Sequence, residues 1–299
     1  MASLVSRSTQ ILEATRSPSF TRDYVKVMRG TEDEWATGTV EWWRGDKKLV
    51  QYRQTKEDIG AVFHLLFSRA DGDPLWLPRS LDPKVILDIG AGVGLSSRYL
   101  AHRYPKAWVF AFEAIPGHLE ILKRNAGWQR RIMVCPFGLG PKNIEYFVSS
   151  PGVGDTETGA DEPLVVVDRA GVNRRLERKS GLQKIQIREI KSAFKEFGVK
   201  RADVIHLDLT GGELELLMAL PPDILRGTGW IYGTLHTDDS MRHLDFKVLN
   251  FLSEWFEIDV HKPMGARRYA FDACNRQIAA SYATFRRERR ADDTLEMNG

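Results

Sequence analysis

The sequence predicts an α/β fold in which one mostly parallel sheet is covered by helices on both faces. From about residue 85 onward, short runs that are continuously apolar alternate with segments whose apolar residues recur at helical spacing. A strand that is apolar along its whole length is buried on both sides, as in a parallel sheet between two helix layers. The chain has 299 residues, of which 42% are hydrophobic and 28% charged, so it is long enough to bury one large core.

Residues 39–80 are predicted to form a hairpin and a lead-in helix ahead of that alternation. The hairpin spans 39–53, where two runs of β-forming residues flank a Gly-Asp turn. Thr55 then has the position of a helix N-cap, with Asp58 at the third helical position as in a capping box. An apolar stripe at helical spacing continues to Phe67, so the helix is predicted to end there.

The alternating part is predicted to form the main domain, over residues 81–280. Its predicted strands are 85–87, 108–112, 132–134, 204–207, 230–236, 256–260 and 269–273. Its predicted helices are 96–103, 116–125, 187–197, 213–220 and 242–255. The stretch 140–183 is expected to be irregular, with a Gly- and acid-rich loop at 151–163.

Both ends of the chain are expected to lie outside the core. Residues 1–38 are predicted to be an N-terminal extension, partly disordered, whose first part through about Phe20 is a solvated tail. That part is rich in Ser and Arg, and it resembles a transit peptide weakly. Residues 281–299 are predicted to be a charged, solvated tail.

Composition narrows the class of protein. The net charge of +3 gives no clear case for a nucleic-acid partner, which would require a clustered basic face. Cys135 and Cys274 are too few for a disulfide framework or a zinc site, and buried thiols of this kind are typical of a reducing compartment. No apolar run is long enough to span a membrane, so a cytoplasmic protein is expected.

The strongest chemical signal is the glycine-rich loop Asp88-Ile89-Gly90-Ala91-Gly92-Val93-Gly94, which follows the first strand of the main domain. Glycines allow a tight turn and a close approach of the backbone to a ligand, and the next helix offers N–H groups to a carboxylate. The glycine spacing departs from the G-x-G-x-x-G of dinucleotide sites. Glu113 ends the second strand, where a carboxylate can accept both hydroxyls of a ribose. Together they predict a site for a cofactor that carries a ribose.

These residues lie in stretches that resemble FkbM-type methyltransferases. Residues 85–126 are similar to the part of the family's domain that binds S-adenosylmethionine, and residues 52–67 are similar to the helix that precedes that domain. Residues 202–217 and 230–236 resemble the two later diagnostic stretches, so the likeness covers roughly residues 40–275. The resemblance implies a Rossmann-like class I methyltransferase with a seven-stranded sheet, S-adenosylmethionine as cofactor, and O-methylation of a small hydroxylated molecule, such as a sugar or a secondary metabolite.

The resemblance also implies site residues. The positions that it assigns to the cofactor are Asp88, Gly90, Ala91, Gly92, Gly94, Glu113, Ala114 and Gly138. The positions that it assigns to the substrate side are Asp208, Glu213 and His236. Thr210 and Thr234 replace the acids that the family carries at those two points, so no metal site is predicted and the substrate class stays open.

Catalysis can be assigned to two of these residues. His236 is the best candidate for a general base, because a neutral imidazole takes up a proton near pH 7, although it could equally be bonded to a nearby loop. Asp208 could orient a hydroxyl or the amino group of the cofactor, or cap the next helix. His206 lies in mid-strand and is expected to be a hydrogen-bonded core histidine. Arg53 and Asp58 could close over the cofactor, while Asp58 could equally act only as a cap.

Two other functions remain open from the sequence. The long 140–183 stretch and the basic run at 286–290 favour a methyltransferase that acts on protein or RNA. The two threonine replacements favour a scaffold that binds S-adenosylmethionine without catalysis. The sequence leaves the oligomeric state open.

Overall fold

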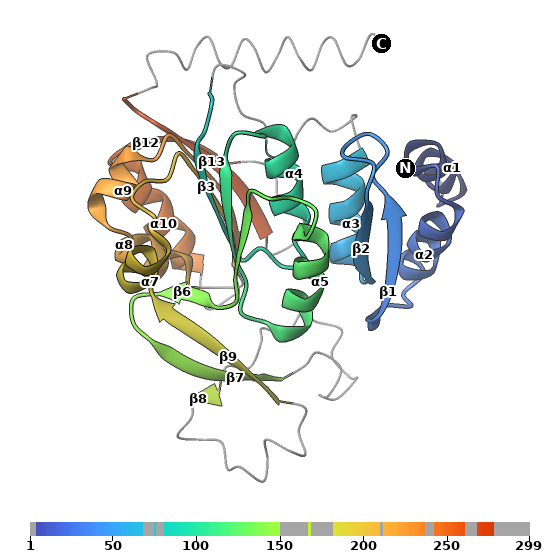
Figure 1. Cartoon of the computed structure of the whole chain (residues 1–299), viewed down its shortest axis with the longest axis horizontal. Helices are drawn as coiled ribbons and strands as arrows, with labels where there is room; N and C mark the ends of the chain where they lie inside the picture. The colour runs from blue at the N-terminus through green and yellow to red at the C-terminus, as the bar shows by residue number, and fades with distance from the viewer. Residues whose placement is uncertain are drawn as a thin grey trace.

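The computed structural model describes residues 4–67, 75, 81–149, 167–168, 182–209, 212–236, 242–260 and 268–277. Its centre is a twisted sheet with helices on both faces, and an N-terminal module of helices and a hairpin lies against one of the two helix layers (Figure 1). Within the described residues, no helix is both long and apolar enough to cross a bilayer.

The central sheet has seven strands in the order β12-β13-β11-β10-β3-β4-β5. These are β3 (Val85–Ile89), β4 (Trp108–Phe112), β5 (Ile132–Cys135), β10 (Val204–Asp208), β11 (Trp230–His236), β12 (Phe256–Val260) and β13 (Arg268–Asn275). β13 is antiparallel to both of its neighbours, and the other pairings are parallel. The predicted fold class is therefore confirmed, as a mostly parallel sheet with one reversed strand.

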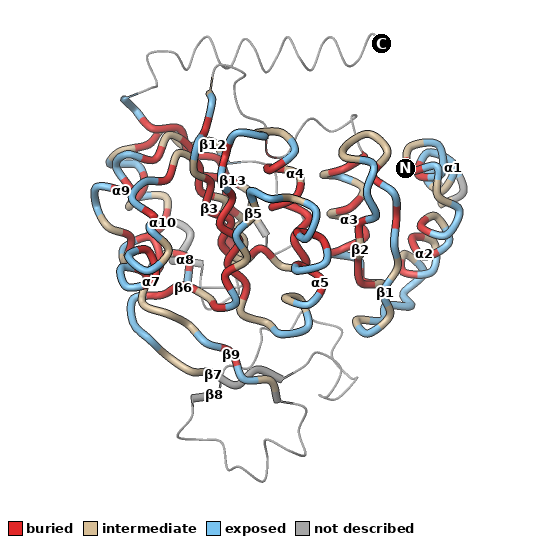
Figure 2. Tube along the Cα trace, viewed as in Figure 1, coloured by how far each residue is buried: buried red, intermediate tan, exposed pale blue. Residues whose placement is uncertain are grey.

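Helices cover this sheet on both faces. One layer holds α4 (Leu95–Arg103) and α5 (Pro116–Ala126), and the other holds α7 (Ile190–Phe197), α8 (Glu213–Ala219), α9 (Pro222–Gly227) and α10 (Arg242–Ser253). Successive side chains of each strand point to opposite faces of the sheet, so each strand packs against both helix layers. Leu87 and Phe110 pack in the core under α7 and α8, while Ile86 and Val109 pack on the opposite face with Leu100 of α4. The central strands are accordingly buried along their length (Figure 2).

The N-terminal module begins with two helices, so the expectation of a solvated tail through Phe20 is wrong. Its elements are α1 (Leu4–Thr15), α2 (Pro18–Met28), β1 (Asp33–Glu41), β2 (Leu49–Gln54), α3 (Lys56–Ala61) and the π-helix η1 (Val62–Phe67). Ser17 caps α2, because its Oγ accepts from the backbone N of Phe20 at 3.2 Å. The ring of Phe20 is fully buried and meets Tyr52 edge-on, with 5.0 Å between ring centroids. Burial of the apolar residues of α1 and α2 orders this segment, although its polar composition predicts a solvated tail.

The hairpin and the lead-in helix of the module are confirmed. β1 and β2 pair antiparallel, and Thr55 caps α3 by accepting from the backbone N of Asp58. The reciprocal half of the capping box does not form, because the Asp58 carboxylate accepts from the backbone N of Arg53 instead. The last turns are π-helical, and Trp42 donates through Nε1 to the carbonyl of Leu66 at their end.

The stretch 140–183 is more regular than expected. β6 (Gly138–Gly140), β7 (Ile144–Ser149), β8 (Val167–Asp168) and β9 (Leu182–Glu189) form a second sheet in the order β6-β9-β7-β8. Ile187 belongs to β9, and α7 begins at Ile190 after the N-cap Glu189, so the predicted start of that helix is three residues too early. The predicted loop at 151–163 lies outside the described residues, as do 281–299.

The module is joined to the core by polar contacts as well as apolar ones. Arg98 of α4 is fully buried and donates to both carboxylate oxygens of Asp46 and to the carbonyl of Leu49. Asn125 of α5 exchanges hydrogen bonds with the backbone of Gln51 at 2.8 Å in both directions. The boundary drawn at residue 81 stays a prediction.

Candidate functional site

The glycine-rich loop crosses from the end of β3 to the start of α4. The carbonyl of Phe112, at the end of β4, accepts from the backbone N of both Gly90 and Ala91 at 3.0 Å. The backbone N of Gly94 donates to the carbonyl of Ala91 at 2.8 Å, which closes a tight turn. The loop is therefore fixed to the carboxyl end of the neighbouring strand, at the edge where open α/β sheets bind ligands.

The three glycines of the loop serve different purposes, although all have positive φ. A Cβ on Gly90 would lie 2.0 Å from the carbonyl oxygen of Asp208, and one on Gly94 would lie 2.5 Å from Leu122. These two glycines make room for the protein itself. A Cβ on Gly92, at φ +54°, would meet nothing within 4 Å. Gly92 is thus the position in the loop where a ligand can approach the backbone.

Glu113 is anchored beside that open position. Its Oε2 accepts from the backbone N of Gly92 at 2.8 Å, and its Oε1 accepts from the backbone N of Ile115 at 2.7 Å. Each carboxylate oxygen has a second lone pair, so both remain able to accept from a ribose hydroxyl. Gly94 caps α4 and no side chain does, so the first N–H groups of the helix suit a ligand carboxylate. The loop, Glu113 and α4 together fit a nucleoside that carries an amino-acid tail.

Asp88 lies beneath the loop, with no exposed surface. Its carboxylate accepts from Ser96 Oγ at 2.8 Å, from Ser97 Oγ, and from His206 Nδ1 at 2.7 Å. The strand register places His206 of β10 directly beside Asp88 of β3. Asp88 therefore ties β3 to the first turn of α4 and shapes the loop from inside, so the structure places its carboxylate away from any ligand surface.

His206 is a hydrogen-bonded core histidine, as predicted. Burial lowers the pKa of its imidazole, but the hydrogen bond with Asp88 and the charges of Asp88 and Asp208 raise it by more, so the net shift is upward. The Asp88 carboxylate and the His206 imidazole therefore satisfy each other's polar atoms inside the protein.

The remaining predicted positions gather at the same edge of the sheet. Ala114 follows Glu113, and a Cβ on Gly138 would lie 3.6 Å from the Cβ of Ala114. Asp208 ends β10 against Gly90, and it is paired in register with Thr234 of β11. β11 continues to His236. The side chain of His236 and all of Thr210 lie outside the described residues, and Glu213 is buried at the start of α8.

Two side chains link the N-terminal module to this site: Arg53, which was expected to close over the cofactor, and His118, which was not singled out from the sequence. Arg53, at the end of β2, forms an ion pair with Asp58 in which Nη2 and Oδ1 are 2.6 Å apart. Its Nη1 lies 2.5 Å from His118 Nε2, and His118 Nδ1 lies 3.8 Å from Glu113 Oε1. The N-terminal module is thus connected through His118 to Glu113, the carboxylate proposed to bind the cofactor. No sequence spacing reveals this contact, because 65 residues separate Arg53 from His118.

Thiol chemistry is excluded by burial. Burial raises the pKa of Cys135 and of Cys274 to about 12, so both thiols are protonated at neutral pH. Within the part of the chain that the structure describes, no three His, Cys, Asp or Glu side chains gather to hold a metal ion.

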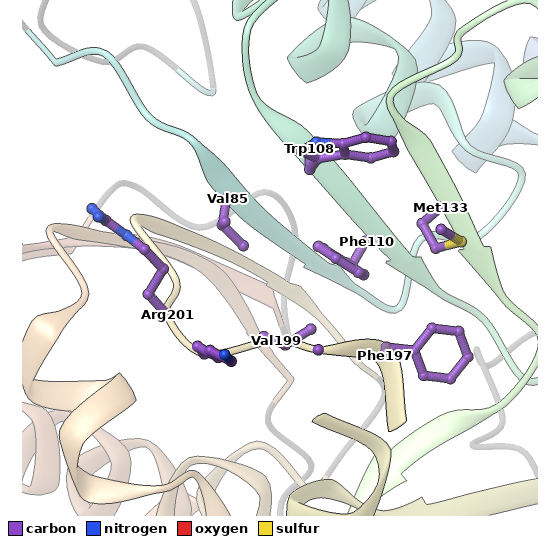
Figure 3. A pocket seen from close by; sticks show the side chains of 9 residues that line it. Val85, Trp108, Phe110, Met133, Phe197, Val199 and Arg201 are labelled. Carbon is purple, nitrogen blue, oxygen red and sulfur yellow. The ribbon is translucent and has the colours of Figure 1, made fainter. Parts of the chain in front are cut away.

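An apolar cavity of about 340 Å³ lies elsewhere on the sheet (Figure 3). Val85 and Trp108, the first residues of β3 and β4, line it together with Met133 and with Phe197 at the end of α7. Asp88 and Glu113 stand at the opposite ends of the same two strands. The cavity is therefore separate from the glycine-rich loop.

The sequence is similar to those of known methyltransferases. The model of the methyltransferase FkbM domain matches residues 88–255. The chain is 26% identical over 200 residues to the methyltransferase sdnD of Sordaria araneosa, a match that covers 60% of this chain and 76% of that protein. It is 43% identical over 54 residues to the malonyl-[acyl-carrier protein] O-methyltransferase of Halorhodospira halophila, which is 18% of each protein. Among solved structures, the precorrin-6y C5,15-methyltransferase of Geobacter metallireducens shares 16% identity and a TM-score of 0.40, over 66% of this chain and 82% of that one.

The family match covers more than half of the chain, from Asp88 in β3 to Trp255 after α10. It includes the glycine-rich loop, Glu113 and the carboxyl ends of β10 and β11. The chain therefore belongs to the FkbM methyltransferase family, and it is a methyltransferase that uses S-adenosylmethionine.

Proposed function

We propose that this methyltransferase methylates a hydroxyl oxygen of a small molecule, of the class of sugars or secondary metabolites. The observation that carries the proposal is the anchoring of Glu113 beside the open Gly92, at the sheet edge that also holds Asp208. In the proposal, a donor held there lies near the carboxyl ends of β10 and β11, which end at Asp208 and His236. The resemblance of the chain to FkbM-type proteins supports a hydroxyl as the acceptor.

In this proposal the residues divide between holding and reacting. Glu113 accepts from the ribose hydroxyls, Gly92 lets the backbone approach, and the N-terminus of α4 receives the carboxylate of the amino-acid tail. S-adenosylmethionine supplies a methyl group that is already activated on a sulfonium. Asp208 orients the acceptor hydroxyl, and His236 takes up its proton.

Magnitudes indicate which of these contributions dominates. Alignment of two reactants supplies on the order of 7–11 kcal/mol of the barrier. A general base supplies roughly 10²- to 10⁴-fold in rate, which is about 3–5 kcal/mol. Alignment therefore contributes more than proton transfer, and the proposed enzyme depends on the loop and Glu113 more than on the base.

A transfer assay tests the acceptor. The full chain is incubated with S-adenosylmethionine labelled in its methyl group and with fractionated cell extract, and we expect label in the small-molecule fraction. The labelled bond should survive mild alkali, because an ether is stable where a methyl ester is hydrolysed. His236→Gln should lower the rate by roughly 10²-fold or more and leave cofactor affinity unchanged, because the loss is confined to proton transfer.

Other results would redirect the assignment. Label only in protein or RNA would replace the small molecule by a macromolecular acceptor. Cofactor binding without transfer to any fraction would indicate a scaffold, and alkali-labile label would indicate a carboxylate acceptor.

A further inference from the structure

A line of charged side chains runs from the N-terminal module to Glu113. Asp58 of α3 holds the Arg53 guanidinium by two bonds, with Oδ1 2.6 Å from Nη2 and Oδ2 2.9 Å from Nε. Asp58 also accepts from the backbone N of Arg53 at 2.8 Å, so the base of the arginine is fixed as well. Only 10% of the Arg53 side chain is exposed. Because Asp58 binds Nε and Nη2 of the planar guanidinium, the direction of Nη1 is fixed.

That direction leads to His118, in the first turn of α5. Arg53 Nη1 lies 2.5 Å from His118 Nε2. A guanidinium only donates, so Nε2 must accept, and the proton of the neutral ring is then on Nδ1. Nδ1 faces Glu113 Oε1 at 3.8 Å. Arg53 therefore sets both the tautomer and the direction of the ring, and the ring presents an N–H to the carboxylate.

His118 does little for the fold by comparison. α5 starts with Pro116 at its first position and buries Ile121 and Leu122, whereas 21% of the His118 side chain is exposed. Both carboxylate oxygens of Glu113 already accept a backbone bond, Oε2 from Gly92 N and Oε1 from Ile115 N. The Nδ1–H of the imidazole lies 3.8 Å from Oε1, which is beyond hydrogen-bond distance, so it attracts the carboxylate electrostatically on that side.

We propose that His118, held by Arg53 and Asp58, is a positioning residue that orients Glu113 toward the ribose hydroxyls of S-adenosylmethionine. The inference rests on the proposed role of Glu113 and assigns the N-terminal module a part in cofactor selectivity. An oriented carboxylate binds a ligand with two hydroxyls more tightly than one with none, since the second lone pair of each oxygen then has no donor.

Calorimetry with two probes tests this inference on the full chain. The probes are S-adenosylhomocysteine and its analogue that lacks the 2′ and 3′ hydroxyls. For the wild type we expect the ratio of the two affinities to be on the order of 10- to 100-fold, as for hydrogen bonds to a charged group. His118→Leu and His118→Ala should lower this ratio by about two- to fivefold, because Glu113 keeps its two backbone bonds and loses only the attraction on the side of Oε1.

Two further variants separate positioning from structure. His118→Gln offers one acceptor and one donor, so it should keep most of the wild-type ratio. Glu57→Gln removes an exposed charge that lies 3.9 Å from Arg53 but outside the line to Glu113, and it should leave the ratio unchanged. A merely structural role for His118 would lower the affinity for both probes alike and leave their ratio where it was.

The outcomes separate failure of the proposed function from failure of this inference. A wild type that binds neither probe would remove the proposed role of Glu113, and this inference with it. If the wild type and the His118→Leu and His118→Ala variants all show the same ratio of affinities for the two probes, this inference would be overturned and the proposed role of Glu113 would stand.

Discussion

Replacing Gly90 by alanine is expected to lower the free energy of unfolding by about 3 kcal/mol or more, because two penalties add. Gly90 has φ +80°, a conformation that costs an L-residue about 1–2 kcal/mol. The new Cβ would also lie 2.0 Å from the carbonyl oxygen of Asp208, which is backbone and cannot rotate away. β3 and β10 would have to separate at the centre of the sheet. Denaturant unfolding followed by circular dichroism measures the loss.

Gly92→Ala is the matched control for this prediction. Gly92 also has positive φ, but its Cβ would meet nothing within 4 Å, so the expected loss of stability is only about 1–2 kcal/mol. The same Cβ points into the space proposed for the cofactor, so affinity for S-adenosylhomocysteine should fall although the protein stays folded. Equal stability of the two variants would contradict the assignment of Gly90 to the fold and Gly92 to the ligand.

Arg98→Met is expected to destabilise the protein by about 3–5 kcal/mol, the usual cost of leaving one partner of a buried ion pair alone. Arg98 is fully buried and donates to both oxygens of Asp46, with Nη2 and Oδ1 2.5 Å apart, and to the carbonyl of Leu49 at 2.6 Å. Burial raises the pKa of Asp46, but the hydrogen bonds and charge of Arg98 lower it by more, so the net shift is downward. Without Arg98, Asp46 would keep its hydrogen bonds from Lys48 N and Gln129 Nε2 but lose its ion-pair partner, and the module would lose this polar attachment to α4.

The control for Arg98 is an ion pair on the surface. Lys56 and Glu32 lie 2.9 Å apart, but both are well exposed, so Lys56→Met should change stability by only about 0–1 kcal/mol. Thermal unfolding of the two variants beside the wild type measures both effects. A loss below about 1 kcal/mol for Arg98→Met would mean that water enters and solvates Asp46, and that the attachment of the module is mainly apolar.

The fold could be predicted where the pattern of apolar residues along a strand is clear. The strands at 108–112, 230–236 and 256–260 have the predicted bounds. The first is apolar throughout, as in a strand buried on both faces, and the last alternates apolar and acidic residues, as in a strand at a sheet edge. The N-terminal helices were not predicted because the segment is rich in polar residues. The sequence does contain a helix start at Ser17 and Pro18 and an apolar stripe that begins at Phe20. The second sheet was missed because its pairing depends on tertiary contacts, although the alternation of Ile185 and Ile187 is a strand period.

The candidate site shows the same division. The glycine-rich loop and Glu113 could be predicted, because a strand end fixes which residues meet at the sheet edge. The structure changed the place of Asp88, whose carboxylate lies beneath the loop with His206. The contact of Arg53 with His118 could not be predicted, because it depends on how the hairpin packs against α5.

The most direct test of the central claim is calorimetry of S-adenosylhomocysteine with the wild type and Glu113→Ala. The claim is that the Gly92 backbone and the Glu113 carboxylate together hold the ribose of the cofactor. We expect the wild type to bind and the variant to bind on the order of 10- to 100-fold more weakly, as for the loss of hydrogen bonds to a charged acceptor. A wild type that does not bind, or a variant that binds as tightly as the wild type, would contradict the claim.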